Sequence, residues 1–208
     1  FHGTKNITSG EGGAITTRNK TLYKKILNLR NHGIEKINIK NKSLGIDKVT
    51  NSQNRWYYEV NNLSLNHKMS ELNCALGISQ LSRFNQFSKT RHEIRKIYDD
   101  SLRKLFFLSK IGNNSSENYV DHLYQVKIDF DKILLNKNQI INKLFSSGIG
   151  TQVHYVPLHK QNVFYKPQKN NILNNSLTFY NNVLSLPFHN AMTEADAVRV
   201  INELKTIK

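Results

Sequence analysis

The chain has 208 residues, of which 38% are hydrophobic, so it is long enough for one large domain or two small ones. Its formal net charge is +15, but the lysines are scattered and lack a basic helix or an aromatic-basic motif, which favours compositional drift with some attraction for a small anionic substrate over a nucleic-acid partner. The single cysteine, Cys74, excludes an intrachain disulfide and is expected in the core; with no apolar run of membrane-spanning length, a cytoplasmic protein is indicated.

The first half is expected to be mainly helical. A β-branched run at 14–17 predicts a strand, and a helix follows over 20–30, capped by Asn19 or Thr17 and ended near Gly33. Residues 34–55 are polar and weakly patterned, which predicts a long loop that ends at the aromatic cluster 56–59. A helical region then begins at Ser70, and its apolar spacing continues to residue 105.

A turn-rich segment at 112–116 predicts a domain boundary. We expect one domain over 1–111 and a small α+β domain over 112–208. The predicted elements of the second domain are strands at 122–130, 149–155 and 184–187 and helices at 138–147, near 173–180 and from Thr193 to 204. The strand at 184–187 is predicted to lie at a sheet edge, because Pro187 cannot donate to a ladder.

A lysine stands five residues before a glycine-rich turn at the start of the sequence. Residues 2–13 read His-x-x-Lys-x-x-Thr-x-Gly-Glu-Gly-Gly, so Lys5 is placed by a turn whose glycines allow sharp bends and close approach. One lysine and a few glycines are a weak pattern, and a surface lysine beside a turn is the alternative interpretation.

Two further segments carry polar side chains in contexts suited to ligand binding. Asn66 precedes a helix start in the segment 65–77, where an amide and helix N–H groups suit a phosphate, and a loop or cap asparagine is the alternative. Gln152, His154 and Tyr155 lie beside a proline turn in the segment 148–159, where they could bind phosphate or sugar hydroxyls. Because side chains alternate along a strand, His154 and Tyr155 are not expected to face one site through the strand alone.

Together these three segments resemble the DegT/DnrJ/StrS family of sugar aminotransferases. The resemblance implies that Lys5 forms the Schiff base with pyridoxal 5'-phosphate and shuttles the proton once the substrate amine has displaced it. It implies that Asn66 reaches the cofactor phosphate of the neighbouring subunit in a homodimer, and that His154 and Tyr155 bind the substrate. His67 and Lys68 depart from the family's aromatic and arginine, and a lysine lacks the bidentate fork of arginine.

Within the family, residues 56–59 and 151–155 most resemble members of pseudaminic acid synthesis. Those members aminate the 4-keto carbon of a UDP-linked deoxy-sugar and take the nitrogen from glutamate. The implied fold is α/β: the C-terminal portion of a type I PLP-dependent aminotransferase, comprising the end of the large cofactor-binding domain and the small domain.

By the same resemblance, the acid that pairs with the pyridine nitrogen, the ring-stacking aromatic and the main phosphate-binding turn would all precede Phe1. The alternative function is therefore an inactive remnant, or one half of a split enzyme that needs an N-terminal half as its partner. His32, His159 and His189 are too dispersed in the sequence to predict a metal site.

Overall fold

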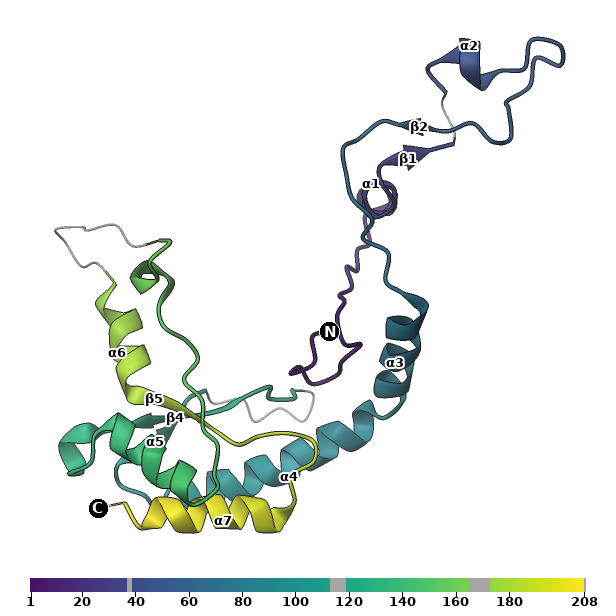
Figure 1. Ribbon diagram of the computed structural model, residues 1–208. Coiled ribbons are helices and arrows are strands. Elements are labelled where there is room, and N and C mark those ends of the chain that lie inside the picture. The colour runs from purple at the N-terminus through teal and green to yellow at the C-terminus, as the bar shows by residue number, and fades with distance from the viewer. Residues whose placement is uncertain (37–38, 113–118, 165–172, 208) are drawn as a thin grey trace. The chain divides into compact units, whose positions relative to one another are not determined.

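The computed structural model describes residues 1–36, 39–112, 119–164 and 173–207 (Figure 1). The chain divides into an N-terminal unit, Phe1–Leu81, and a C-terminal unit, Ser82–Lys208. The domain boundary at 111/112 stays a prediction, and the division of the structure into two units falls at 81/82. The reason is packing, since Ile94, Tyr98 and Leu102 of one long helix lie in the hydrophobic core of the C-terminal unit.

Helix α1 (Lys20–Arg30) of the N-terminal unit has the predicted bounds. Its cap is Asn19, whose side chain accepts from two backbone N–H groups of the first turn. The predicted stop is confirmed at Gly33, which has φ +69° and donates its N–H to the Asn28 carbonyl at 3.0 Å. A Cβ at this position would lie 2.0 Å from the Asn62 carbonyl oxygen, so the turn needs both the positive φ and the missing side chain.

The segment predicted as a long loop contains short regular elements. Strand β1 (Ile34–Glu35) pairs antiparallel with β2 (Glu59–Val60), and helix α2 (Lys42–Gly45) lies between them in the chain. The Glu59 carboxylate accepts from the backbone N–H groups of Lys40 and Asn41 at 2.8 and 2.7 Å. These bonds hold the pKa of Glu59 below its ordinary value and fasten α2 to the hairpin.

The strand predicted at 14–17 is wrong. This run is irregular, and Ile15 has 73% of its surface exposed. A strand is stabilised by a neighbouring strand that binds its backbone N–H and C=O groups, and none of the residues that the structure describes pairs with this run. Local β propensity therefore does not decide the backbone here.

Helix α3 (Glu71–Ser82) begins directly after Ser70, whose Oγ accepts from the Asn73 N–H at 3.2 Å, which confirms the predicted start. The helix buries none of its residues, and Leu72 is 83% exposed. Cys74 is half-buried rather than a core residue.

The C-terminal unit is built around a three-stranded antiparallel sheet. Strands β3 (Leu108–Lys110), β4 (Tyr124–Ile128) and β5 (Val183–Leu186) run in the order β3-β4-β5. Helix α4 (Phe84–Leu102) contributes the predicted apolar stripe to the core and lies beside α7 (Glu194–Lys205), as Figure 1 shows. The predicted alternation in β4 is confirmed, because Tyr124, Val126 and Ile128 are buried and the two residues between them are more open.

Strand β5 is not an edge strand, which corrects the prediction from Pro187. All four residues of β5 are buried, and the strand pairs with β4 on one side and with Gln152 on the other. Pro187 follows the last strand residue, so its missing N–H costs the ladder nothing. The strand predicted at 149–155 is reduced to a single bridge, in which Gln152 and Ser185 exchange backbone bonds of 3.1 and 2.8 Å.

The remaining helices agree with the predictions. They are α5 (Lys137–Ser146) and α6 (Asn174–Asn182), with short 3-10 turns at Phe130–Lys132 and Leu158–Lys160. Helix α7 begins with the predicted cap, in which Thr193 and Asp196 form a capping box. Of the predicted linker 112–116, residues 113–116 lie outside the described residues. Among the helices that the structure describes, none is long and apolar enough to span a membrane.

Candidate active site

The glycine-rich segment around Lys5 folds into a compact loop. The Lys5 N–H donates to the His2 carbonyl at 3.0 Å, and the Ser9 N–H donates to the Phe1 carbonyl at 2.9 Å. Ser9 is 1% exposed, although its neighbours in the loop are mostly open to solvent. A buried serine in a largely exposed loop indicates that another segment packs against the loop at Ser9.

The anchor comes from helix α3. Asn73 donates from Nδ2 to the carbonyl oxygens of Ser9 and Glu11, at 2.7 and 2.9 Å. Gly12 makes the close approach possible, because it has φ +149° and a Cβ there would lie 2.8 Å from both the Met69 Sδ and the Ser9 Oγ. The sequence predicted that this turn requires glycine, and the structure gives the reason: the close contacts at Gly12 leave no room for a side chain.

The Lys5 side chain is exposed, and among the described residues it forms no hydrogen bond or ion pair. The carboxylate of the loop is engaged elsewhere, since Glu11 lies 3.7 Å from the His2 Nε2. An amine that is held by its backbone and not by a carboxylate is free to react with a carbonyl compound. These features fit an aldehyde cofactor at Lys5.

Asn66 lies in the same unit and is held by a separate set of contacts. The Asn66 backbone forms an antiparallel bridge with Asn31 at the end of α1. The Asn66 Oδ1 accepts from the Lys68 N–H at 3.1 Å. Since the side-chain oxygen is engaged, the exposed Nδ2 is the group directed to other partners. An amide N–H₂ group suits a phosphate oxygen, so the side chain fits the role that the resemblance implies.

In the C-terminal unit, His154 and Tyr155 line a cavity of about 650 Å³. The opposite wall is formed by helix α6 through Ser176 and Phe179. The cavity combines ring nitrogens, hydroxyl groups and apolar surface, which is the composition of a small-molecule site.

The two predicted residues reach the same cavity because the chain leaves the strand after Gln152. The His154 Nδ1 lies 2.7 Å from the buried Ser185 Oγ, which fixes the imidazole on the sheet. The Tyr155 ring packs edge-on against that imidazole at 4.7 Å between centroids and keeps 72% of its surface exposed. This agrees with the expectation that the strand alone would not bring both side chains to one site, and Gln152 does not line the cavity.

Sequence reasoning missed two residues of these sites. Asn73 lies in the segment 65–77, but nothing in its spacing indicates that it binds a loop more than sixty residues earlier. His159 lines the cavity beside Tyr155, and its buried Nε2 has no hydrogen-bond partner among the described residues. Its position four residues after Tyr155 is the signal that could have included it. The described residues contain no group of three or more His, Cys, Asp or Glu side chains placed to hold a metal ion.

The chain is similar to known proteins along its whole length. It is 34% identical over 208 residues to a UDP-4-amino-4,6-dideoxy-N-acetyl-beta-L-altrosamine transaminase of Campylobacter jejuni, a match that covers 100% of this chain and 50% of the relative. An uncharacterized protein of Methanocaldococcus jannaschii, MJ1066, is also 34% identical, over 100% of this chain and 52% of that protein. The chain therefore spans about half the length of the curated relatives it matches.

Solved structures show the same fold. The Helicobacter pylori PseC aminotransferase, which is involved in pseudoaminic acid biosynthesis, superposes with a TM-score of 0.79 at 25% identity and covers 99% of this chain and 51% of its own. The PLP-form of a putative sugar aminotransferase from Streptococcus pneumoniae, Spr1654, gives a TM-score of 0.76 at 23% identity, with 99% and 50% covered. The fold is thus the predicted C-terminal portion of a type I PLP-dependent aminotransferase. The model of the DegT/DnrJ/EryC1/StrS aminotransferase family matches residues 1–205, and the chain belongs to this family.

Proposed function

We propose that the chain provides the cofactor lysine and the substrate-binding segment of a PLP-dependent aminotransferase that acts on a nucleotide-linked 4-keto-deoxy-sugar. The observation that carries the proposal is the Lys5 amine, which is exposed, unpaired among the described residues and fixed on a loop that Asn73 anchors. The transaminase of Campylobacter jejuni to which the chain is similar supports a UDP-linked amino sugar as the product class. Glutamate as the amino donor follows from the resemblance of the sequence to this group.

Lys5 is the residue that would hold pyridoxal 5'-phosphate and exchange a proton with the substrate. When bound, this cofactor supplies a reactive aldehyde and a ring that accepts electrons from the substrate carbon. The protein's part is to keep the amine near that carbon so that it can act as a base, and the anchored loop suits this task. A histidine at this position could not form the covalent link, so Lys5 favours transamination.

Asn66 is proposed to bind the cofactor phosphate of a second subunit. Its side-chain oxygen already accepts from Lys68, which leaves Nδ2 as a donor to an anion. The N-terminal unit would then belong to the cofactor-binding domain and the C-terminal unit to the small domain, in a cytoplasmic homodimer. The measurable consequence is a dimer mass in solution.

His154 and Tyr155 are proposed to bind the nucleotide-sugar. With the His154 Nδ1 held by Ser185, the Nε2 is the ring nitrogen that can meet a phosphate or a hydroxyl group. The exposed Tyr155 offers its hydroxyl group and its ring face from the same cavity. Gln152 is also proposed to bind the substrate, although it does not line that cavity.

The experiment that tests this function is site-resolved labelling. Pyridoxal phosphate is added to the purified chain, borohydride fixes any covalent link, and peptide mass spectrometry reports the modified fraction at each lysine. We expect modification concentrated at Lys5 and lost in Lys5→Ala. Labelling spread evenly over the exposed lysines would contradict the proposal.

One half of a split aminotransferase is the second candidate, and the surface of the N-terminal unit favours it. Leu63 is 100% exposed and Leu72 is 83% exposed, although side chains of this size usually pack against other polypeptide. Adding the N-terminal half of the Campylobacter jejuni relative should then raise the transaminase activity of the chain. The same activity with and without that half would favour the chain acting alone, and no activity in either case would favour an inactive remnant.

A further inference from the structure

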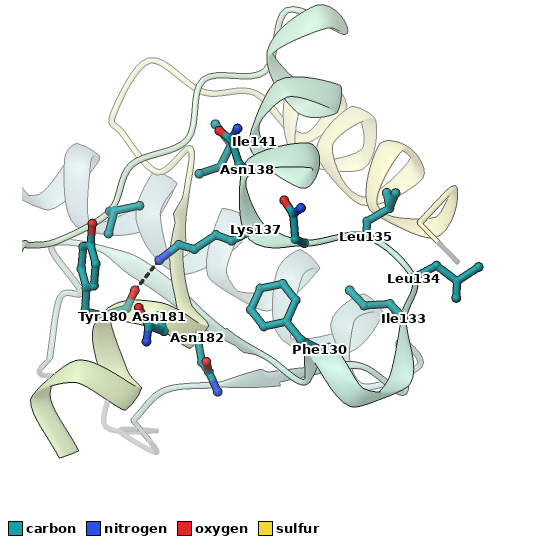
Figure 2. A pocket seen from close by; sticks show the side chains of 12 residues that line it. Phe130, Ile133, Leu134, Leu135, Lys137, Asn138, Ile141, Tyr180, Asn181 and Asn182 are labelled. Carbon is teal, nitrogen blue, oxygen red and sulfur yellow. Dashed lines mark hydrogen bonds between the residues drawn. The ribbon is translucent and has the colours of Figure 1, made fainter. Parts of the chain in front are cut away.

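A second cavity lies in the C-terminal unit, apart from the candidate active site. Its volume is about 570 Å³, and Figure 2 shows the side chains that line it. Apolar side chains form much of its wall, notably Phe130, Ile133, Ile141 and Val153. Such a volume and lining are typical of sites for small organic ligands.

Among the residues that the structure describes, Lys137 is the only charged one that lines this cavity. Its ammonium group donates to the carbonyl oxygen of Tyr180 and lies 5.1 Å from the centre of the Tyr180 ring, as Figure 2 shows for the hydrogen bond. Burial lowers the pKa of Lys137 from its ordinary value. In the part of the chain that the structure describes, Lys137 forms no ion pair with a carboxylate.

A structural role explains part of this arrangement. Tyr180 lies in the last turn of α6, where a cation stabilises the free carbonyl groups of a helix end. This contact uses one of the three donors of the ammonium group. It leaves the other donors available to a ligand in the cavity that Lys137 lines.

The backbone adds a second preference for negative charge at the same place. The start of α5 lines the cavity through Asn136, Lys137 and Asn138, and a helix start carries a partial positive charge. We propose that this cavity binds a small organic carboxylate, whose anionic group contacts Lys137 and whose apolar body packs on Phe130, Ile141 and Val153. A carboxylate would supply the missing counter-charge, and the apolar wall would select against small inorganic anions.

This site is separate from the proposed active site, although the two share segments. Val153 and Tyr180 line the carboxylate cavity, whereas the next residue His154 and the preceding residue Phe179 line the cavity of the candidate active site. A ligand in one cavity therefore contacts neighbours of the residues that line the other. The His154→Ala variant distinguishes the two sites, because it should leave carboxylate binding unchanged.

Three probes test the proposal on the full chain by ¹H–¹⁵N NMR titration. Benzoate carries the carboxylate and an apolar ring, benzamide is its neutral counterpart of similar shape, and inorganic phosphate is an anion without an apolar body. We expect benzoate to shift the amide signals of residues 137–141 and 180–182, with an affinity at least about tenfold higher than that of the other two probes. Equal shifts with benzamide or with phosphate would overturn the proposal.

Lys137→Met is compared with Lys143→Met as the matched control. Both lysines lie on α5 and donate to a backbone carbonyl, but Lys143 binds Thr206 and does not line the cavity. Benzoate affinity should fall about tenfold in Lys137→Met and stay unchanged in Lys143→Met. Equal losses in the two variants would show a non-specific effect of positive charge and would overturn the site.

If Lys137→Met does not fold, Asn181→Asp provides the test. Asn181 also lines the cavity, and the substitution keeps its shape while adding a carboxylate that competes with the ligand for Lys137. We expect weaker benzoate binding in Asn181→Asp at neutral pH. Unchanged binding in this variant would contradict the proposed contact with Lys137.

Discussion

Asn73 binds Ser9 across more than sixty residues of sequence: its Nδ2 donates to the Ser9 carbonyl at 2.7 Å and to the Glu11 carbonyl at 2.9 Å. The two bonds hold the glycine-rich loop against the first turn of α3. Ser70 orients the Asn73 side chain by donating from Oγ to the Asn73 Oδ1 at 2.5 Å. The position of Lys5 therefore depends on a helix that follows it far along the chain.

Removing the Asn73 amide should loosen the loop. In Asn73→Ala two carbonyl groups lose their donor, and we expect the free energy of local opening to fall by about 1–3 kcal/mol. Asn73→Asp should be at least as disruptive, because it keeps the shape and the acceptor but points a carboxylate at two carbonyl groups. Hydrogen exchange of residues 9–13 reports the opening, and wild-type protection in Asn73→Asp would contradict the proposed anchor.

Gly12 should not tolerate a side chain, whereas its neighbour should. Gly12→Ala places a methyl group 2.8 Å from the Met69 Sδ and the Ser9 Oγ at a φ of +149°, so we expect a loss of about 1–3 kcal/mol in loop stability and weaker labelling of Lys5. Gly13→Ala is the control, because a Cβ there has nothing within 4 Å. Equal effects of the two substitutions in a thermal melt and in labelling would contradict this account.

The start of α7 should make stability depend on pH in the acid range. The Thr193 N–H and hydroxyl group donate to Asp196 at 2.8 and 2.7 Å, and these bonds hold the pKa of Asp196 below its ordinary value of 3.8. Since the folded state lowers this pKa, the contribution is fully present above pH 3.8 and is lost as the pH falls through the lower folded value.

The comparison for this prediction is Asp196→Asn, which keeps the shape of the cap and removes its charge. Urea unfolding at pH 7 should show the wild type to be more stable than the variant, and the difference should shrink as the pH falls below 3.8. A difference that stays constant down to pH 2 would mean that the charge of Asp196 does not contribute to the cap.

Uridine diphosphate should discriminate between the three predicted substrate residues. His154 and Tyr155 line one cavity and Gln152 does not, so we expect His154→Ala to weaken binding of this probe about tenfold and Gln152→Ala to leave it nearly unchanged. Isothermal titration measures both affinities. A larger loss in Gln152→Ala would place the nucleotide outside the cavity that His154 lines.

Local patterns predicted the elements whose stabilising contacts are local. Helix α7 follows from the capping box of Thr193 and Asp196, and the alternation of β4 follows from one buried face. The prediction of strands failed where pairing with a distant segment decides whether and where a strand forms. The run containing Ile15 has β propensity but pairs with no described strand, and β5 is internal because Gln152 pairs with it from another segment.

The candidate site shows the same division. Lys5, Asn66 and the His154–Tyr155 pair were predicted from the family resemblance, because each lies in a short run of sequence that the resemblance covers. The cross-link from Asn73 could not be predicted, since it joins two segments whose separation carries no periodic signal. The strand alternation showed that His154 and Tyr155 need a departure from the strand to share a cavity, but it did not show that the chain leaves the strand after Gln152.

The assignment of Lys5 as the cofactor lysine is tested by the fraction of Lys5 that is modified after reaction with pyridoxal phosphate and borohydride. Lys20 is the internal reference, because it is also an exposed lysine of the N-terminal unit but lies on helix α1. We expect several times more modification at Lys5 than at Lys20, and a lower ratio of Lys5 to Lys20 modification in Asn73→Ala. Equal modification of the two lysines in the wild-type chain would contradict the assignment of Lys5 as the cofactor lysine.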